Sequence, residues 1–165
     1  MIYKDCFSYL MLLEQGSLEG CPPWGMTNIY FQQWCTKNGI VPVNVMRASR
    51  EQASQFAFDN YYVPSGSAVL LGSLNFTVFQ CAYNIGNVEA IKILQGVLGI
   101  PQDGVFGPIT KRTANDSQIH ATIRSFLIGQ NNYYKAIENV ADEKWENGWH
   151  NRVSHTARIV DVVLK

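Results

Sequence analysis

The sequence predicts an all-α fold with one buried central helix, and three observations support this. Apolar residues recur at helical spacing over residues 3–14. Residues 66–84 form a segment that is too apolar on all sides for a surface helix and too long for one strand. Only residues 39–45 alternate with period two, and Pro42 limits them to an edge strand or an extended loop.

The first two helices follow from stop and start signals. The first is expected over residues 3–14, and it places Glu14 at its C-terminal end because glycine follows two residues later. Thr27 or Asn28 is expected to cap the second helix, which continues through Trp34. The segment between them carries a second glutamate, a cysteine and two prolines, and it is expected to be a loop.

A third helix is expected over about 50–61, because Ser49 with Gln52 three residues later matches a capping box. The apolar segment 66–84 then gives the buried central helix.

The C-terminal half predicts further helices. Asn87 is expected to cap one that ends at Gly99, and Pro108 suits the first turn of the next. Two more are expected over about 117–141 and 148–164. Because neither a repeat nor a linker-like composition divides the chain, we expect one domain over 1–165.

Composition excludes several function classes. Thirteen basic residues balance thirteen acidic ones, and both signs occur in both halves, which argues against nucleic acid as a partner. The N-terminal residues lack a long apolar run, so neither a signal peptide nor membrane insertion is expected, and the protein is expected to be made in a cytosol.

The four cysteines lack the spacing of a zinc site, and we expect no metal and no cofactor. Cys6, Cys35 and Cys81 are interpreted as small buried thiols. Cys21 is different, because it lies in an expected loop close to Glu14 and Glu19 in sequence.

Glu14 is the first candidate for chemistry. The negative end of a helix dipole and the apolar neighbours Leu13 and Trp24 would both favour its protonated form. A carboxylic acid that keeps its proton can protonate a leaving oxygen, which glycoside cleavage requires.

Three stretches resemble known glycosidases. The order Glu14, Cys21, Thr27 resembles the Glu, Asp-or-Cys, Thr series of phage-type lysozymes, although only six residues separate the first pair. Residues 82–110 resemble the region of glycoside hydrolase family 108 in which an Asn-x-Gly turn leads to a Leu-Gln helix and an Asp-Gly-x-x-Gly-Pro-x-Thr loop. The matching residues are Asn84, Gly86, Leu94, Gln95, Asp103, Gly104, Gly107, Pro108 and Thr110. "GWHNRV" resembles that family's Gly-Trp-x-Asn-Arg, here Gly148, Trp149, Asn151 and Arg152.

The resemblance spans residues 14–152 and implies a compact lysozyme-like helical fold, with 1–84 as the catalytic part and 85–165 as a peptidoglycan-binding-like part packed with it as one unit. It also implies cleavage of the β-1,4 bond between N-acetylmuramic acid and N-acetylglucosamine, with Glu14 as catalytic acid. The family's usual loop aspartate is missing, and Gln80 stands where the family has another aspartate. Three residues are candidates for the second catalytic group: Glu19, Cys21 and Thr27.

Five residues are candidate sugar contacts. Trp24, Tyr83 and Trp149 have aromatic faces on which the C–H surface of a pyranose ring can stack. Asn84 and Gln95 belong to the family-108 motif and are its candidate polar contacts. The loop around Asp103 is expected to be a tight turn before a helix, and Gly107 is expected to need a backbone conformation that other residues avoid.

The sequence therefore predicts a muramidase with peptidoglycan glycan strands as its substrate. It is expected to be a monomer and to act as a phage endolysin, as a virion lysozyme or as a bacterial secretion activator. An endolysin would wait in the host cytoplasm for release by a holin, and a virion enzyme would have an assembly partner. Lytic transglycosylase chemistry stays open, and the alternative is a non-catalytic peptidoglycan-binding or structural protein on the same fold.

Overall fold

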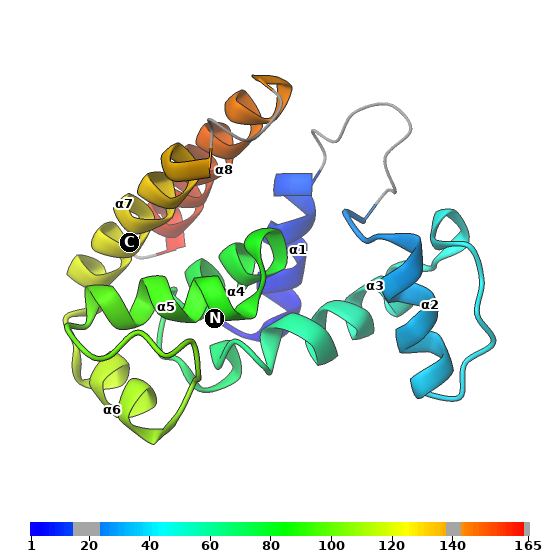
Figure 1. Ribbon diagram of the computed structural model, residues 1–165, viewed down its shortest axis with the longest axis horizontal. Coiled ribbons are helices and arrows are strands. Elements are labelled where there is room, and N and C mark those ends of the chain that lie inside the picture. Colours follow the sequence, from blue (N-terminus) through cyan, green and yellow to red (C-terminus); the bar gives the residue numbers. More distant parts are fainter. Residues whose placement is uncertain (15–23, 138–142, 164–165) are drawn as a thin grey trace.

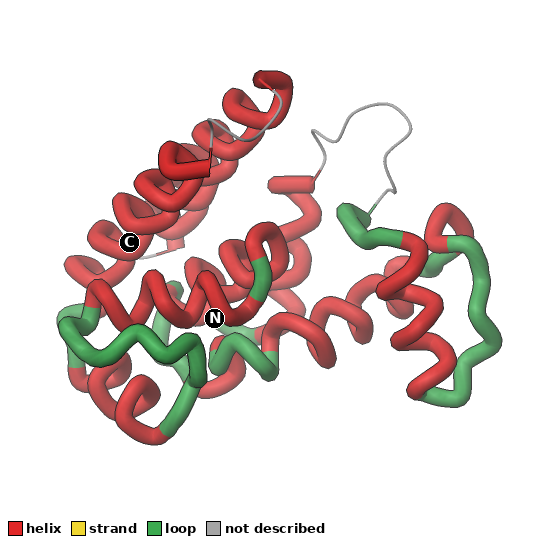
Figure 2. The backbone as a smooth tube through the Cα atoms, viewed as in Figure 1, coloured by secondary structure: helices red, strands yellow, loops and turns green. Residues whose placement is uncertain are grey.

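The computed structural model describes residues 1–14, 24–137 and 143–163, apart from the side chains of 143–147 and 162–163. In these ranges helices are joined by loops, and no strand forms (Figures 1 and 2). The all-α prediction is confirmed. The α-helices are α1 (Tyr3–Glu14), α2 (Asn28–Lys37), α3 (Arg50–Ala57), α4 (Leu74–Ile85), α5 (Asn87–Val97), α6 (Pro108–Asp116), α7 (Ile119–Ile137) and α8 (Glu143–Val163). Three short helical turns are η1 (Val45–Arg47), η2 (Phe58–Tyr62) and η3 (Ser67–Val69).

Helix α4 is the buried central helix, and it packs against α1, α5 and α7. Every residue from Leu74 to Ala82 is buried. The expected start near residue 66 is wrong by eight residues. Gly66 and Gly72 have φ of +79° and +57°, in the left-handed region that a right-handed helix excludes, so η3 and a turn precede α4.

The expected starts of α2 and α3 are confirmed. Thr27 occupies the N-cap position of α2, which continues to Lys37. Ser49 and Gln52 form both hydrogen bonds of a capping box before α3. The helix then continues into η2, a π-helical turn in which Val63 N donates to Phe58 O over 3.1 Å.

The C-terminal helices differ from expectation mainly at their first residues. Gly86, and not Asn87, holds the cap position of α5, and the Asn87 side chain instead donates to Asn60 O over 2.8 Å. Pro108 is the first residue of α6, as predicted. Helix α8 begins five residues earlier than expected and lies beside α7 (Figure 1).

The hydrophobic core is one cluster that contains residues from Cys6 of α1 to Val160 of α8. Cys6, Cys35 and Cys81 are buried free thiols, which confirms the interpretation of those three. Cys21 lies outside the described residues. Among the helices that the structure describes, none has the length and apolar character needed to cross a membrane. Because α1 packs against both α4 and α8, its C-terminal residue is brought next to the last helix of the chain.

Candidate active site

Glu14, the last residue of α1, is paired with an arginine of α8. Arg152 Nη2 donates to Glu14 Oε1 over 2.5 Å, and the side chains are only 12% and 8% exposed for Glu14 and Arg152, respectively. Removing either partner of such a pair would leave a poorly solvated charge, which is costly. The pair therefore favours the conformation in which the two side chains meet. It joins residues 138 positions apart, and the final helix therefore holds the end of the first.

Two residues of α8 that lie within one helical turn of Arg152 contact α7. The Trp149 indole stacks on the Tyr134 ring, with centroids 5.3 Å apart and an interplanar angle of 9°. His150 Nδ1 lies 2.7 Å from Asn131 Oδ1. Because both contacts are made by residues close to Arg152 on the same helix, they fix the position and rotation of this part of α8, from which the Arg152 side chain extends to Glu14.

The chain segment before α2 lies against the other side of Glu14. Gly25 has φ of +69°, and a Cβ atom placed there would lie 2.5 Å from Glu14 Oε2. Two hydrogen bonds hold this segment: Tyr83 Oη donates to Trp24 O over 2.6 Å, and Trp24 Nε1 donates to Ala48 O over 3.1 Å. Only glycine fits at position 25 without displacing the carboxylate.

Three neutral donors lie around the Glu14–Arg152 pair. Burial raises the pKa of Tyr83 well above its ordinary value, and the negative charge of Glu14 adds to the shift. Burial also raises the pKa of Tyr134 and of the Cys81 thiol, and Arg152 offsets only part of either shift. These hydroxyls and this thiol therefore keep their protons at neutral pH, which leaves none of them as a base.

A chain of side-chain hydrogen bonds links α4 to α7 behind the site. Gln80, which stands where family-108 sequences usually have aspartate, donates to Gln130 Oε1 over 2.8 Å. Gln130 Nε2 donates to Tyr134 Oη over 2.8 Å, and Tyr134 Oη donates to Asn84 Oδ1 over 2.7 Å. Two buried atoms, Gln80 Oε1 and Arg152 Nη1, have no hydrogen-bond partner in the described part of the chain. The chain of bonds ends at Asn84, which is exposed.

Of the three candidates for the second catalytic group, Thr27 lies within the described residues. Thr27 is exposed at the N-cap of α2, and its hydroxyl does not cap that helix. It follows Gly25 by two residues, which puts it on the segment that lies against Glu14. Cys21 and Glu19 fall outside the described residues.

Gln95 of α5 is a buried clamp on the loop between α5 and α6. Its Nε2 donates to Asp103 Oδ1 over 2.6 Å, to Val105 O over 3.1 Å and to Thr110 Oγ1 over 3.2 Å. Its Oε1 accepts from Gly104 N over 2.9 Å, and the residue is 2% exposed. Because its donors and its acceptor are used within the protein, the structure favours a scaffold role over the predicted sugar contact.

The strained glycine of this loop is Gly104, and the expectation for Gly107 is wrong. Gly104 has φ of +72°, and an added Cβ would lie 2.8 Å from Val88 Cγ1. Gly107 has φ of −97° and ψ of −178°, and an added Cβ would meet nothing within 4 Å. Extended backbone of this kind also suits the residue that precedes Pro108.

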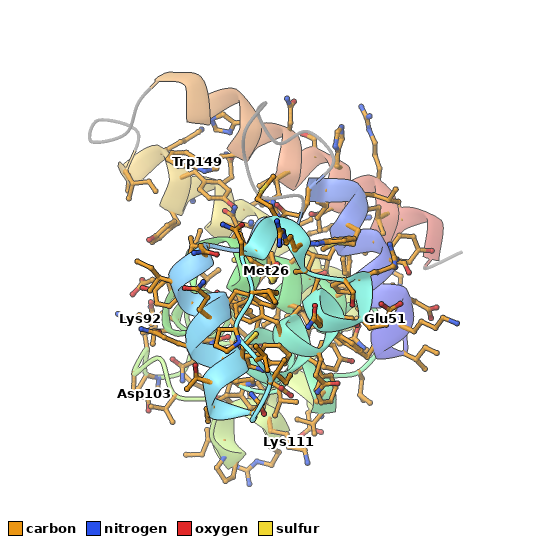
Figure 3. The ribbon with its side chains drawn as sticks, turned by 90° about the vertical axis from the view of Figure 1, so that its right-hand side faces the viewer. Met26, Glu51, Lys92, Asp103, Lys111 and Trp149 are labelled. Atoms are coloured by element: carbon orange, nitrogen blue, oxygen red, sulfur yellow. The ribbon has the colours of Figure 1, made fainter. Side chains whose placement is uncertain are left out.

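The remaining candidate sugar contacts lie near the Glu14 end of the molecule. Trp24 and Tyr83 belong to the segment and helix that flank Glu14, whereas Trp149 and Asn84 both contact Tyr134. Figure 3 shows Trp149 at one end of the view, with Asp103 and Lys111 at the other. The aromatic motif of α8 and the Asp103 loop are therefore at opposite ends of the molecule.

Comparison with known proteins identifies a shared fold. No family model and no curated protein matches the sequence. The structure of Brucella abortus SagA matches with a TM-score of 0.78 and 20% sequence identity, over 98% of this chain and 94% of that one. At this identity the match shows that the two chains have the same fold over nearly their whole lengths.

Sequence reasoning gave no role to three residues of the site. Arg152 belongs to the Gly-Trp-x-Asn-Arg pattern, but its partner is far away in sequence. Gly25 lies two residues before Thr27, and its closeness to Glu14 is visible only in three dimensions. Tyr134 has no local signal, because a tyrosine on the apolar face of a helix is usually a core residue.

Proposed function

We propose that this chain cleaves peptidoglycan glycan strands as a muramidase, at the β-1,4 bond between N-acetylmuramic acid and N-acetylglucosamine. The observation that carries the proposal is the Glu14–Arg152 pair. Each partner belongs to a separate stretch that resembles family-108 lysozymes, and the fold brings them together. The fold shared with Brucella abortus SagA is compatible with this assignment.

In the proposed reaction Glu14 donates its proton to the glycosidic oxygen as the C–O bond breaks. Arg152 holds Oε1, which leaves Oε2, the oxygen that faces Gly25, for the transfer; Glu14 has to take up that proton against the preference of its guanidinium partner for the carboxylate. After the transfer Glu14 is a carboxylate, and the guanidinium at 2.5 Å stabilises that charge. Arg152 thus acts both by orienting the acid and by stabilising its product form.

The second step needs a water molecule at the anomeric carbon, directed by Thr27, Cys21 or Glu19. Thr27 is favoured by its place on the segment that lies against Glu14. Substituting each of the three separately, with a melt of every variant, identifies the group by a large loss of rate at unchanged melting temperature.

The test of the proposal is cleavage of purified peptidoglycan by wild type and by Glu14→Gln. We expect wild type to clear a peptidoglycan suspension. Glu14→Gln is expected to stay folded at a lower melting temperature, because Arg152 loses its counter-ion, and to clear the suspension roughly a hundredfold or more slowly, because general acid catalysis typically supplies that factor. Asp5→Asn is the matched control, since Asp5 is an exposed carboxylate at the other end of α1.

Each outcome decides between defined alternatives. Near-wild-type activity of Glu14→Gln would remove the central assignment. Binding to peptidoglycan without cleavage by wild type would favour a non-catalytic wall-binding protein. Mass spectrometry of the products separates a hydrolase, which releases reducing ends, from a lytic transglycosylase, which releases anhydro-sugars. The biological role that we propose for this activity is that of a phage endolysin, a virion lysozyme or a bacterial secretion activator.

A further inference from the structure

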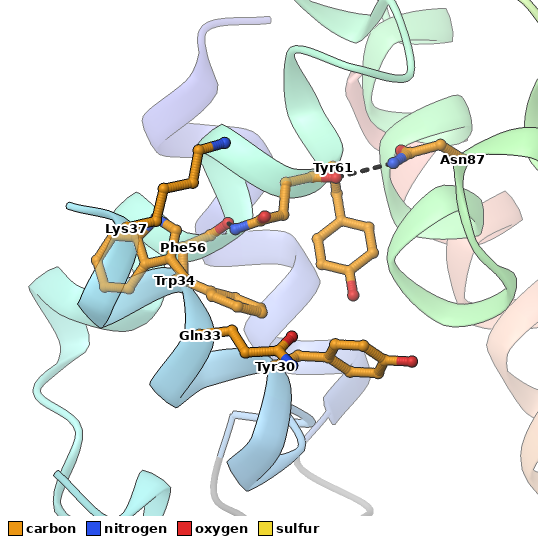
Figure 4. A pocket seen from close by; sticks show the side chains of 8 residues that line it. Tyr30, Gln33, Trp34, Lys37, Phe56, Tyr61 and Asn87 are labelled. Carbon is orange, nitrogen blue, oxygen red and sulfur yellow. Dashed lines mark hydrogen bonds between the residues drawn. The ribbon is translucent and has the colours of Figure 1, made fainter. Parts of the chain in front are cut away.

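A pocket of about 350 Å³ lies between α2, α3 with η2, and the start of α5 (Figure 4). Its volume is at the lower end of the range for small-molecule sites. Its lining consists of Tyr30, Gln33, Trp34, Lys37, Phe56, Asn60, Tyr61 and Asn87. None of the candidate sugar contacts from the sequence is among these residues.

The pocket has the mixed lining that a sugar ring requires. Tyr30 is 62% exposed, and it projects from α2 toward the Tyr61 ring (Figure 4). Aromatic faces suit the C–H surfaces of a pyranose, and amides can both donate to and accept from its hydroxyl and acetamido groups. No carboxylate lines the pocket, and Lys37 is its one cation among the described residues. This nearly neutral lining favours a neutral ligand over a nucleotide or a polycation.

Two asparagines of the lining each donate an amide hydrogen within the protein, and among the described residues one of them presents a free acceptor. Asn60 Nδ2 donates to Phe56 O and Asn87 Nδ2 donates to Asn60 O, each over 2.8 Å. Asn87 Oδ1 is buried and has no partner among residues 1–14, 24–137 and 143–163. A buried acceptor of this kind is normally satisfied by water or by a ligand. The wall at the start of α5 is therefore suited to a hydroxyl or acetamido N–H donor.

The pocket is connected to Glu14 by a short row of contacts. The Tyr61 and Tyr83 rings have centroids 4.9 Å apart, and Tyr83 Oη donates to Trp24 O. The next residue, Gly25, faces Glu14 Oε2. A linear polymer whose scissile bond lies at Glu14 has further units on both sides of that bond, so one side of the strand can continue into the pocket.

We propose that this pocket is a subsite for an N-acetylated sugar of the glycan strand, at a distance from the bond that is cut. The inference rests on the proposed function for its choice of polymer. Tyr30 provides the exposed stacking face, and Gln33, Asn60 and Asn87 provide the polar contacts. The pocket thus determines how strongly long strands bind.

The experiment compares Tyr30→Ala with Ile29→Ala on peptide-free glycan strands of increasing length. Ile29 is the matched control, because it is a neighbouring apolar residue of α2, is 66% exposed and does not line the pocket. We expect Tyr30→Ala to raise KM roughly five- to tenfold on long strands with kcat nearly unchanged, and to leave short fragments unaffected. Unchanged KM, or equal losses at every length, would overturn the subsite.

A binding measurement separates failure of the subsite from failure of the proposed function. Glu14→Gln protein is titrated with N-acetylglucosamine oligosaccharides and followed by backbone amide NMR. Shifts that cluster at residues 30, 33, 60 and 61 and disappear in the Glu14→Gln, Tyr30→Ala double variant support the subsite even if wild type cleaves nothing. Cleavage by wild type without those shifts overturns the subsite and leaves the muramidase assignment standing.

Discussion

The Glu14 site and the Gln95 loop are both built on buried polar side chains, but they assemble over very different lengths of chain. Glu14 meets its partner across 138 residues, and a third segment, at Gly25, closes the other side. Gln95 makes all four of its hydrogen bonds to residues between 8 and 15 positions away. The local cluster sets the path of one loop, whereas the long-range cluster sets the relative positions of three elements.

This difference bears on how sequence motifs are interpreted. The Asp-Gly-x-x-Gly-Pro-x-Thr stretch is the most extensive of the motifs, and the structure uses it as a clamp and a helix start. The sparser signals, one glutamate and one arginine, form the candidate site. In this chain the denser sequence motif therefore reflects local folding, whereas the candidate site forms where two separate motifs meet.

Arg152→Met is expected to have the largest effect on stability. It leaves Glu14 nearly buried without its counter-ion, and the loss of unfolding free energy is expected to be about 3–5 kcal/mol. Urea unfolding measures it. The double variant Glu14→Gln, Arg152→Met is expected to recover part of the loss, because neither charge remains. Strictly additive losses would show that the pair does not couple α1 to α8.

Gly25→Ala is expected to reduce cleavage by roughly a hundredfold, since displacing a reacting group by an ångström can have that effect. The new Cβ would push Glu14 Oε2, the end of a flexible side chain, so the carboxylate moves. Gly39→Ala is the matched control: Gly39 has φ of +68°, and a Cβ there meets nothing within 4 Å. Both variants should lose about 1–2 kcal/mol of stability. Equal activity in the two variants would contradict the contact.

Gln95→Met keeps the side-chain volume but removes four hydrogen bonds. The stranded groups include Gly104 N, and the expected loss is about 2–3 kcal/mol in a denaturant melt, with wild-type cleavage by the remaining folded protein. Gln102→Met, at an exposed glutamine of the same loop, is expected to change little. Lost wall binding at unchanged stability would instead show that Gln95 contacts substrate.

The comparison of Gly104→Ala with Gly99→Ala isolates the smallest of the four effects. Its Cβ would crowd Val88 Cγ1 at 2.8 Å and Val88 O at 3.3 Å. Gly99→Ala, at φ of +69° with nothing near the Cβ, shares the backbone strain without the crowding. The difference between their unfolding free energies is expected to be about 1 kcal/mol, with equal activities. A large loss of activity in Gly104→Ala alone would remove the distinction between the two regions.

Local rules predicted much of the fold. The capping box at Ser49 and the proline at the start of α6 depend on neighbours in sequence, and both are confirmed. The start of α4 was missed because hydrophobic patterning does not reveal where a left-handed glycine interrupts a helix. Arg152 and Gly25 were missed for a different reason. Each acts by touching Glu14, and no property of its own neighbourhood indicates that contact.

The π-helical turn η2 has a consequence for changes in chain length. It contains one residue more than an α-helical turn would need, and it separates buried Tyr62 from Tyr61 and Asn60, which line the pocket. Deleting one residue here would restore α-helical winding and leave the residues after η2 on nearly the same faces, because the wider π turn takes up the extra residue. A one-residue deletion would therefore remove one of the side chains that η2 places between the core and the pocket, without moving the rest of the helix. Related chains that keep the pocket are expected to keep this insertion even where the amino acids within it differ.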